Sequence, residues 1–310
     1  MKKRPNILFL MTDEQRYDAV GYVNPQVLTP HLDAMARESV CFLNAYTANP
    51  SCIPARAAIF TGRYPSQCGV PGYMSFLPEK ETTFMKLLRD GGYYTAVIGK
   101  QHFWKSKIEK GYDYEDIVDE HFPPEVISDK ITEGYFGQPA NKTVSDRVSS
   151  YVTYLMENGF TEGSQLYRQI NDKGVYEFFA DEKYHVDSYI GTRGKQWLEK
   201  EAPADRPWFL TLPFPGPHMP FDGIGLPDAE GYHEEEMELP DTNIRDIFNK
   251  PPHYLDIAKK FGQLDLKNHT SPDGLTAEDI RLMKKAYYAK MTLIDRKIGE
   301  VLDTLKKRGM

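Results

Sequence analysis

The chain has 310 residues, of which 40% are hydrophobic and 27% are charged, a balance that is typical of a globular protein and excludes a disordered or collagen-like one. Its 45 acidic residues outnumber its 38 basic ones, and the net charge of −7 without any long basic run excludes a nucleic-acid binder. It contains no stretch of about 20 apolar residues, so we also expect no membrane partner.

The predicted elements alternate between strand and helix. Three short apolar runs are uninterrupted, which is typical of parallel strands buried on both faces. This alternation predicts an α/β fold with a mostly parallel sheet and helices on both faces. In chain order, the pattern predicts a strand at 6–12, helices at 29–38, 54–61 and 82–90, strands at 94–98 and 208–212, and a helix at 276–308.

Two segments lack this clear periodicity. Residues 104–206 are rich in aromatic and charged residues, and residues 222–275 are rich in Pro, Asp and Asn. We interpret both segments as insertions that decorate a sheet built by the rest of the chain.

The cysteine content and the start of the chain indicate in which cellular compartment the protein is found. The three cysteines form no Cys-x-x-Cys pair, which disfavours a disulfide scaffold and a zinc cluster. The apolar run at 7–11 is too short for the core of a signal peptide. We therefore predict a cytoplasmic protein, unless a leader has been removed.

Polar residues follow each predicted strand. Asp13 ends the first strand, Lys100 and His102 follow the second, and His218 follows the third. Ligands of such folds bind beyond the carboxyl ends of the strands, so these side chains are candidates for one site. Each residue taken singly has an alternative interpretation, in which it only marks the return of the chain to solvent.

The segment around Cys52 predicts an anion site. Pro54 suits the first turn of a helix, which places Cys52 at or just before the helix N-terminus. Free backbone N–H groups and the positive end of the helix dipole favour an anion there, and Arg56 lies about one turn further on. The alternative is a small buried cysteine beside a helix cap. The spacing between Cys52 and Arg56 also differs from the five-residue phosphate loop of cysteine phosphatases.

These residues resemble a known family. The run Cys52-Ile-Pro-Ala-Arg56, followed by Thr61-Gly-Arg63, is similar to the signature of type I, formylglycine-dependent sulfatases of the alkaline-phosphatase-like superfamily. The resemblance is strong over residues 5–103 and 207–221 and weaker over 276–310. Three further motifs carry it in the family's order, at 5–13, 99–102 and 217–220.

The resemblance implies a nucleophile and a cation. A formylglycine-generating maturation enzyme would oxidise Cys52, and a hydroxyl of the hydrated aldehyde would attack the sulfur of a sulfate ester. Asp13 and Glu14, together with the modified Cys52, would hold one divalent cation. All-oxygen ligation makes this cation Ca²⁺ first, with Mg²⁺ or Mn²⁺ as alternatives.

The resemblance also implies the residues that bind the sulfate. Arg56, Lys100, His102 and His218 would surround it, stabilise its developing charge and help to protonate the leaving alcohol. The implied substrate is a small-molecule or saccharide sulfate ester. Aromatic residues within 104–206 either stack on the rings of that substrate or fill the core of the insertion; they are Tyr112, Tyr114, Phe122, Tyr135 and Phe136.

The sequence departs from the family in two places. Glu14 stands where many members carry a second aspartate, and no strand with an Asp-Asn or Asp-His pair follows the helix at 276–308. We therefore expect residues 1–310 to be an incomplete amino-terminal catalytic domain whose carboxy-terminal part is missing.

Three alternatives to a sulfatase remain open from the sequence. The first is a phosphonate or phosphate monoester hydrolase of the same superfamily, and the second is an inactive, truncated remnant that only binds anions. The third is a plain cysteine enzyme.

Overall fold

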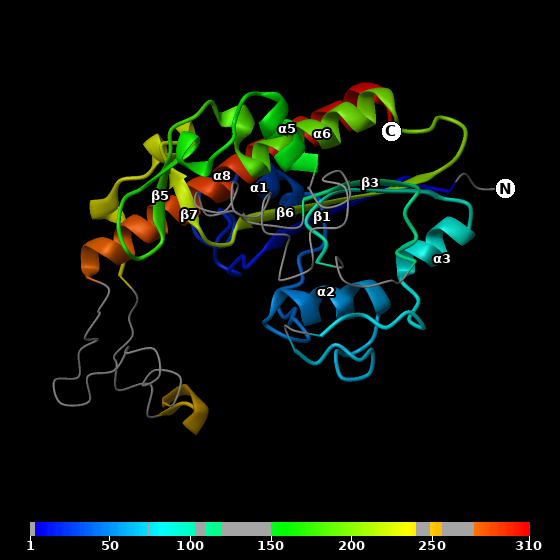
Figure 1. Ribbon diagram of the computed structural model, residues 1–310, viewed down its shortest axis with the longest axis horizontal. Coiled ribbons are helices and arrows are strands. Elements are labelled where there is room, and N and C mark those ends of the chain that lie inside the picture. The colour runs from blue at the N-terminus through cyan, green and yellow to red at the C-terminus, as the bar shows by residue number, and fades with distance from the viewer. Residues whose placement is uncertain (1–3, 73–74, 103–108, 119–149, 240–248, 256–275) are drawn as a thin grey trace.

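In the part of the chain that the structure describes, the main sheet has four parallel strands (Figure 1). The computed structural model describes residues 4–72, 75–102, 109–118, 150–239, 249–255 and 276–310. Across the sheet the order is β1 (Ile7–Asp13), β6 (Trp208–Pro217), β2 (Tyr94–Gly99) and β3 (Tyr114–Ile117). The predicted parallel sheet is thereby confirmed.

Helices cover both faces of this sheet, as predicted (Figure 1). On one face lie α2 (Cys52–Thr61) and α3 (Phe84–Asp90). The opposite layer contains α1 (Pro30–Arg37), α5 (Ser150–Glu157), α6 (Val186–Lys200) and α8 (Ala277–Arg308).

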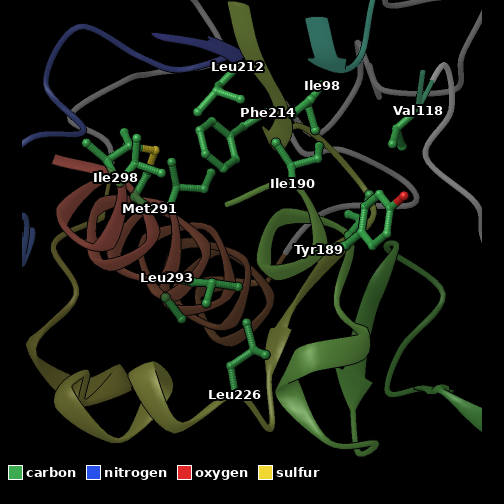
Figure 2. Packing of buried hydrophobic residues seen from close by; sticks show 14 of the residues in the cluster. Ile98, Val118, Tyr189, Ile190, Leu212, Phe214, Leu226, Met291, Leu293 and Ile298 are labelled. Carbon is green, nitrogen blue, oxygen red and sulfur yellow. The ribbon is translucent and has the colours of Figure 1, made fainter. Parts of the chain in front are cut away.

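The buried strand β6 feeds both layers of the core. Phe209 packs in the cluster that contains α2 and α3, whereas Leu210 and Leu212 pack in the cluster that contains α6 and α8. Figure 2 shows Leu212 and Phe214 facing the side chains of α8. Since successive side chains of a strand point to opposite faces, an uninterrupted apolar run is what a strand between two helical layers requires.

Several elements were not predicted. They are β3, α5, α6 and a small second sheet of β4 (Tyr167–Gln169), β5 (Val175–Phe178) and β7 (Phe221–Ile224). The structure also has short 3-10 helices at Gly163–Gln165, Glu182–Tyr184, Pro227–Gly231 and Glu234–Glu236.

Helix α6 was not predicted from the sequence for a physical reason. Its two glycines weaken the helical signal, yet they permit close packing. A Cβ atom on Gly194 would lie 2.8 Å from the Leu212 side chain, and one on Gly191 would lie 2.5 Å from Lys297 Cβ. The interpretation of 104–206 as a segment that only decorates the sheet is therefore wrong, since its described part contributes strand β3 to the main sheet and helices α5 and α6 to the covering layer.

Helix α8 begins and ends where its sequence predicts. The Thr276 hydroxyl accepts a hydrogen bond from the Asp279 backbone N–H (3.0 Å), and Asp279 accepts one from the Thr276 N–H (2.9 Å), forming a capping box. Gly309 ends the helix in the left-handed conformation. Among the helices that the structure describes, none is long and apolar enough to cross a lipid bilayer.

Candidate active site

Asp13, the last residue of β1, is the centre of a buried ion cluster. Its Oδ2 lies 2.5 Å from Lys100 Nζ and 3.1 Å from Arg56 Nη2. All three residues are buried, with 5% or less of their surface exposed. Burial alone raises the pKa of the Asp13 carboxyl, but the charges of Lys100 and Arg56 outweigh burial and lower it. The cluster is therefore an ionised carboxylate held by two cations.

The parallel sheet brings these residues together. Asp13 pairs in register with Pro217, so the residues after β6 start beside it, and Lys100 follows the neighbouring β2. Gly99 permits the close approach of β2 and β6, since its φ is +131° and a Cβ atom would lie 2.3 Å from the Pro213 carbonyl oxygen. The Lys100 backbone N–H then donates to that same carbonyl (2.9 Å).

Helix α2 supplies Cys52 and Arg56. Ser51 is its N-cap, Cys52 is its first residue, and its first turn carries no acidic side chain. Cys52 therefore lies at the positive end of the helix dipole, as the sequence predicts. Arg56, one turn further on, donates to the Lys100 carbonyl oxygen and to Asp13, so its guanidinium orders the carboxylate and the end of β2.

The Cys52 thiol is half-buried and lies within reach of the charges of Lys100, Asp13 and Arg56. Burial raises its pKa, and the opposing effect of the Lys100 charge does not offset this. The unmodified side chain is therefore a neutral thiol at neutral pH, which makes it a poor nucleophile.

His102 lies beside the same cluster. Burial, reinforced by the Lys100 and Arg56 charges, lowers the pKa of its imidazole to about 3. Its backbone has a φ of +63°, and that of Glu14 is +54°. Left-handed conformations are uncommon for residues other than glycine and concentrate at functional sites, and here both follow strand ends at one site.

His218 and Glu14 face each other across the ends of β6 and β1. His218 Nε2 lies 3.2 Å from Glu14 Oε1, and His218 Nδ1 lies 2.6 Å from the Met219 carbonyl oxygen. Burial lowers the pKa of His218. Because a carbonyl oxygen only accepts, Nδ1 carries a proton, whereas Nε2 faces the Glu14 carboxylate, whose charge opposes the effect of burial on the pKa of His218.

The charges of this site favour an anion. Among the buried side chains, Asp13 contributes one negative charge, Lys100 and Arg56 contribute two positive charges, and His102 and Cys52 are neutral. Burial lowers the pKa of Lys100, an effect that the Asp13 charge opposes, and the Glu14 carboxylate adds an acidic group that is more than half exposed. The buried excess of one positive charge lies next to the N-terminus of α2, where the helix dipole adds to it.

The described residues make up only part of a cation site. Among them, no group of three or more His, Cys, Asp or Glu side chains is arranged to hold a metal ion. Ca²⁺ takes six to eight oxygen ligands. Asp13 offers a buried carboxylate, but its Oδ2 is engaged by Lys100 and Arg56, and Glu14 points to His218. We therefore assign no chemical step to a metal here.

The structure brings the sequence-predicted site residues to one end of the sheet, and it adds two that we did not predict as site residues. Tyr287 and Lys290, on α8, contact the segments that carry Glu14 and His218. In the sequence, the helix carries apolar residues at helical spacing, a stripe that includes Ile280, Met283, Tyr287, Met291 and Ile294. A lysine on that stripe is the signal that could have revealed Lys290.

The aromatic residues for which substrate stacking and core packing were both open fall into two groups. Tyr112 packs in the core cluster of α2 and α3, and Tyr114 packs against that of α6 and α8. The other three, Phe122, Tyr135 and Phe136, lie outside the described residues.

Comparison with known proteins decides the family. A sulfatase family profile matches residues 5–310. The chain belongs to the sulfatase family. It is 31% identical over 307 residues to a protein of Escherichia coli K12 named "uncharacterized sulfatase YidJ", covering 98% of this chain and 54% of that protein. It is also 27% identical over 317 residues to a choline-sulfatase of Rhizobium meliloti, covering 99% of this chain and 55% of the relative. This sulfatase chain thus spans about half the length of these relatives.

The fold is alkaline-phosphatase-like, as the resemblance implied. The structure of a phosphonate monoester hydrolase from Agrobacterium radiobacter superimposes with a TM-score of 0.72 at 19% identity, covering 99% of this sulfatase chain and 60% of the hydrolase. At this identity the likeness establishes the fold alone.

Proposed function

We propose that the protein hydrolyses organic sulfate esters and that Cys52, converted to formylglycine, is its nucleophile. The substrate is a small-molecule or saccharide sulfate ester. The choline-sulfatase relative acts on an ester of this class, which supports the proposal.

One observation carries the proposal: a buried, net positive cluster lies beside the first residue of a helix that begins with Cys52. A tetrahedral oxyanion matches this charge. The neutral thiol at that place is a weak nucleophile, so conversion of Cys52 by a formylglycine-generating partner enzyme accounts for a cysteine where an oxygen nucleophile is needed.

In this proposal the chain's own residues bind and orient the sulfate group. Lys100 stabilises the charge that develops on the sulfate oxygens, and Arg56 keeps Asp13 and the end of β2 in place. His102 and His218 exchange a proton with the leaving oxygen, and the negative charge of a bound sulfate raises the pKa of both imidazoles toward the range this needs.

Two groups complete the proposal. Formylglycine would supply the oxygen nucleophile, and a bound divalent cation, Ca²⁺ before Mg²⁺ or Mn²⁺, would supply positive charge for the sulfate oxygens. Asp13 and Glu14 of this chain would be ligands of the cation, together with the modified Cys52.

Mass spectrometry tests the modification. When the protein is co-expressed with a maturation enzyme, the peptide that contains Cys52 should become about 18 Da lighter, because an aldehyde replaces the thiol. Peptides containing Cys41 and Cys68 are internal controls and should keep their mass. An unmodified Cys52 that reacts rapidly with iodoacetamide at neutral pH would instead support a cysteine enzyme.

The structural likeness to a phosphonate monoester hydrolase supports one second candidate, a phosphonate or phosphate monoesterase. Turnover of an aryl sulfate, an aryl phosphate and a phenylphosphonate ester by matured full-length protein separates the two. We expect the highest kcat/KM for the sulfate, and Cys52→Ala as the control should abolish turnover. Preference for either phosphorus ester would contradict the sulfatase proposal, and binding of sulfate without turnover would support a non-catalytic anion-binding protein.

A further inference from the structure

A second ion cluster lies beneath the segment that carries His218. Lys290 of α8 is buried, and its Nζ lies 2.9 Å from the His218 carbonyl oxygen, 3.1 Å from that of Pro220 and 2.7 Å from Asp222 Oδ1. The ammonium group donates hydrogen bonds to the two carbonyl oxygens, and Asp222 pairs with its charge. Lys290 therefore contacts the backbone on both sides of Met219.

Helix α6 holds the start of the same segment. Asp187 Oδ1 accepts a hydrogen bond from the Gly216 backbone N–H (3.0 Å). The two approach closely, since a Cβ atom on Gly216 would lie 2.4 Å from Asp187 Oδ2. His185, the N-cap of α6, lies between Asp187 and Asp222: its Nδ1 accepts from the Asp187 backbone N–H (3.2 Å), and its Nε2 faces Asp222 Oδ2 (3.5 Å).

The stability of the fold alone does not explain why α8 carries a buried lysine at position 290. Removing two ions from water carries a penalty of several kcal/mol per ion, and a well-packed hydrophobic pair is often as stable as a buried ion pair. Burial raises the pKa of the Asp222 carboxyl, but the charge of Lys290 and a hydrogen bond from His185 outweigh it and lower that pKa, so Asp222 is ionised. The hydrogen bonds that a hydrophobic pair would lose are those to the His218 and Pro220 carbonyls.

One turn earlier, α8 holds the facing segment. The Tyr287 hydroxyl accepts from the Arg16 backbone N–H (2.8 Å) and donates to the Glu14 carbonyl oxygen (2.8 Å). Glu14 and His218, whose side chains meet at 3.2 Å, are thus both tied by their backbones to the same part of α8.

We infer that Lys290 is a positioning residue for His218: by holding the carbonyl oxygens of His218 and Pro220, it fixes the imidazole relative to Asp13 and Cys52. This inference rests on the proposed function for its catalytic consequence. The positioning itself is a property of the chain and is testable without turnover.

A double variant separates two roles of Lys290: holding the carbonyl oxygens of His218 and Pro220, and neutralising the charge of Asp222. Lys290→Met alone leaves Asp222 buried and unpaired, which destabilises a protein strongly. Lys290→Met combined with Asp222→Asn removes both charges and still abolishes the bonds to the two carbonyls. Lys297→Met is the matched control, since Lys297 is also a buried lysine of α8 but pairs with Glu300 (2.9 Å) and Glu182 (3.5 Å).

In the matured full-length protein, we expect the double variant to lower kcat for an aryl sulfate by about 100-fold, because misplacement by about 1 Å has effects of this size. KM should change by less than about threefold, since substrate binding is retained. The Lys297→Met control should stay within about threefold of the wild type in both constants. A folded double variant with wild-type kcat would overturn the inference.

Hydrogen exchange gives a readout that is independent of activity. The Gly216, Phe221 and Asp222 amides donate hydrogen bonds in the wild-type structure. In the double variant we expect them to exchange about tenfold faster or more, while amides of β2 keep their protection. Unchanged exchange at all three amides would also overturn the inference. If the wild type hydrolyses no sulfate ester, the proposed function fails, and the exchange result still decides the role of Lys290.

Discussion

Burial governs the protonation of the side chains around Cys52. It raises the pKa of the Cys52 thiol and lowers the pKa of His102, while Asp13 stays ionised because two cations hold it. The sequence motifs predicted which residues meet here. They did not predict that two of these residues are neutral, because burial depends on the surrounding layers rather than on local spacing.

His102 provides a test at this scale. In protein stripped of divalent metal, its imidazole should stay neutral down to about pH 4 when followed by NMR, since burial lowers its pKa from 6.5 to about 3. Below pH 6.5 the unfolded chain then binds a proton that the folded chain does not, so this residue makes the free energy of unfolding fall as the pH drops toward 3.

The variant His102→Asn is the control, because asparagine tolerates the left-handed backbone. Between pH 7 and 4, its free energy of unfolding, measured by chemical denaturation, should fall less steeply with pH than that of the wild type. A His102 titration midpoint near the ordinary value would contradict the interpretation.

Helices and strands were predictable to different degrees. The strands β1, β2 and β6 could be predicted because uninterrupted apolar runs suit a sheet covered on both faces. Strand β3 could not, since its four residues include Glu115 and Asp116. A helix cap such as Thr276 lies next to its helix in the chain and can be predicted from the sequence. A cap that comes from a distant helix cannot be predicted in this way.

Helix α1 has such a distant cap. Its own N-cap residue, Thr29, makes no capping hydrogen bond, and Asp295 of α8 accepts instead from the His31 N–H (3.1 Å) and the Leu32 N–H (2.7 Å). Asp295→Ala should therefore lower the free energy of unfolding by about 1–2 kcal/mol, as loss of a helix cap does. Urea denaturation measures this change.

Asp303, exposed on the same helix, provides the control. Asp303→Ala should change the stability by less than about 0.5 kcal/mol. Equal losses in the two variants would show that the acidic charge on α8, and not the hydrogen bonds to α1, is what stabilises the protein.

At the scale of the whole fold, the described residues form two core layers that share one sheet. Met85 is buried in the layer of α2 and α3, and Leu293 in that of α6 and α8 (Figure 2). Since β6 carries side chains into both layers, loss of either layer exposes the sheet that supports the other.

We therefore expect one cooperative unfolding transition. Met85→Ala and Leu293→Ala should each lower the free energy of unfolding by about 2–5 kcal/mol. The double variant should show the sum within about 0.5 kcal/mol, since the two residues lie in different core clusters. Two separate transitions, seen by calorimetry and by far-UV circular dichroism, would contradict a single unit.

The contacts of Tyr287 and Lys290 have a geometric consequence. The two residues are three apart on a rigid helix, which separates them by about 4.5 Å along its axis. The rise of α8 over three residues thus sets the separation between its contacts with the Glu14 segment and with the His218 segment. A shift of this helix would carry both loops in the same direction and leave their mutual spacing intact, so the pair moves relative to Cys52 only as a unit.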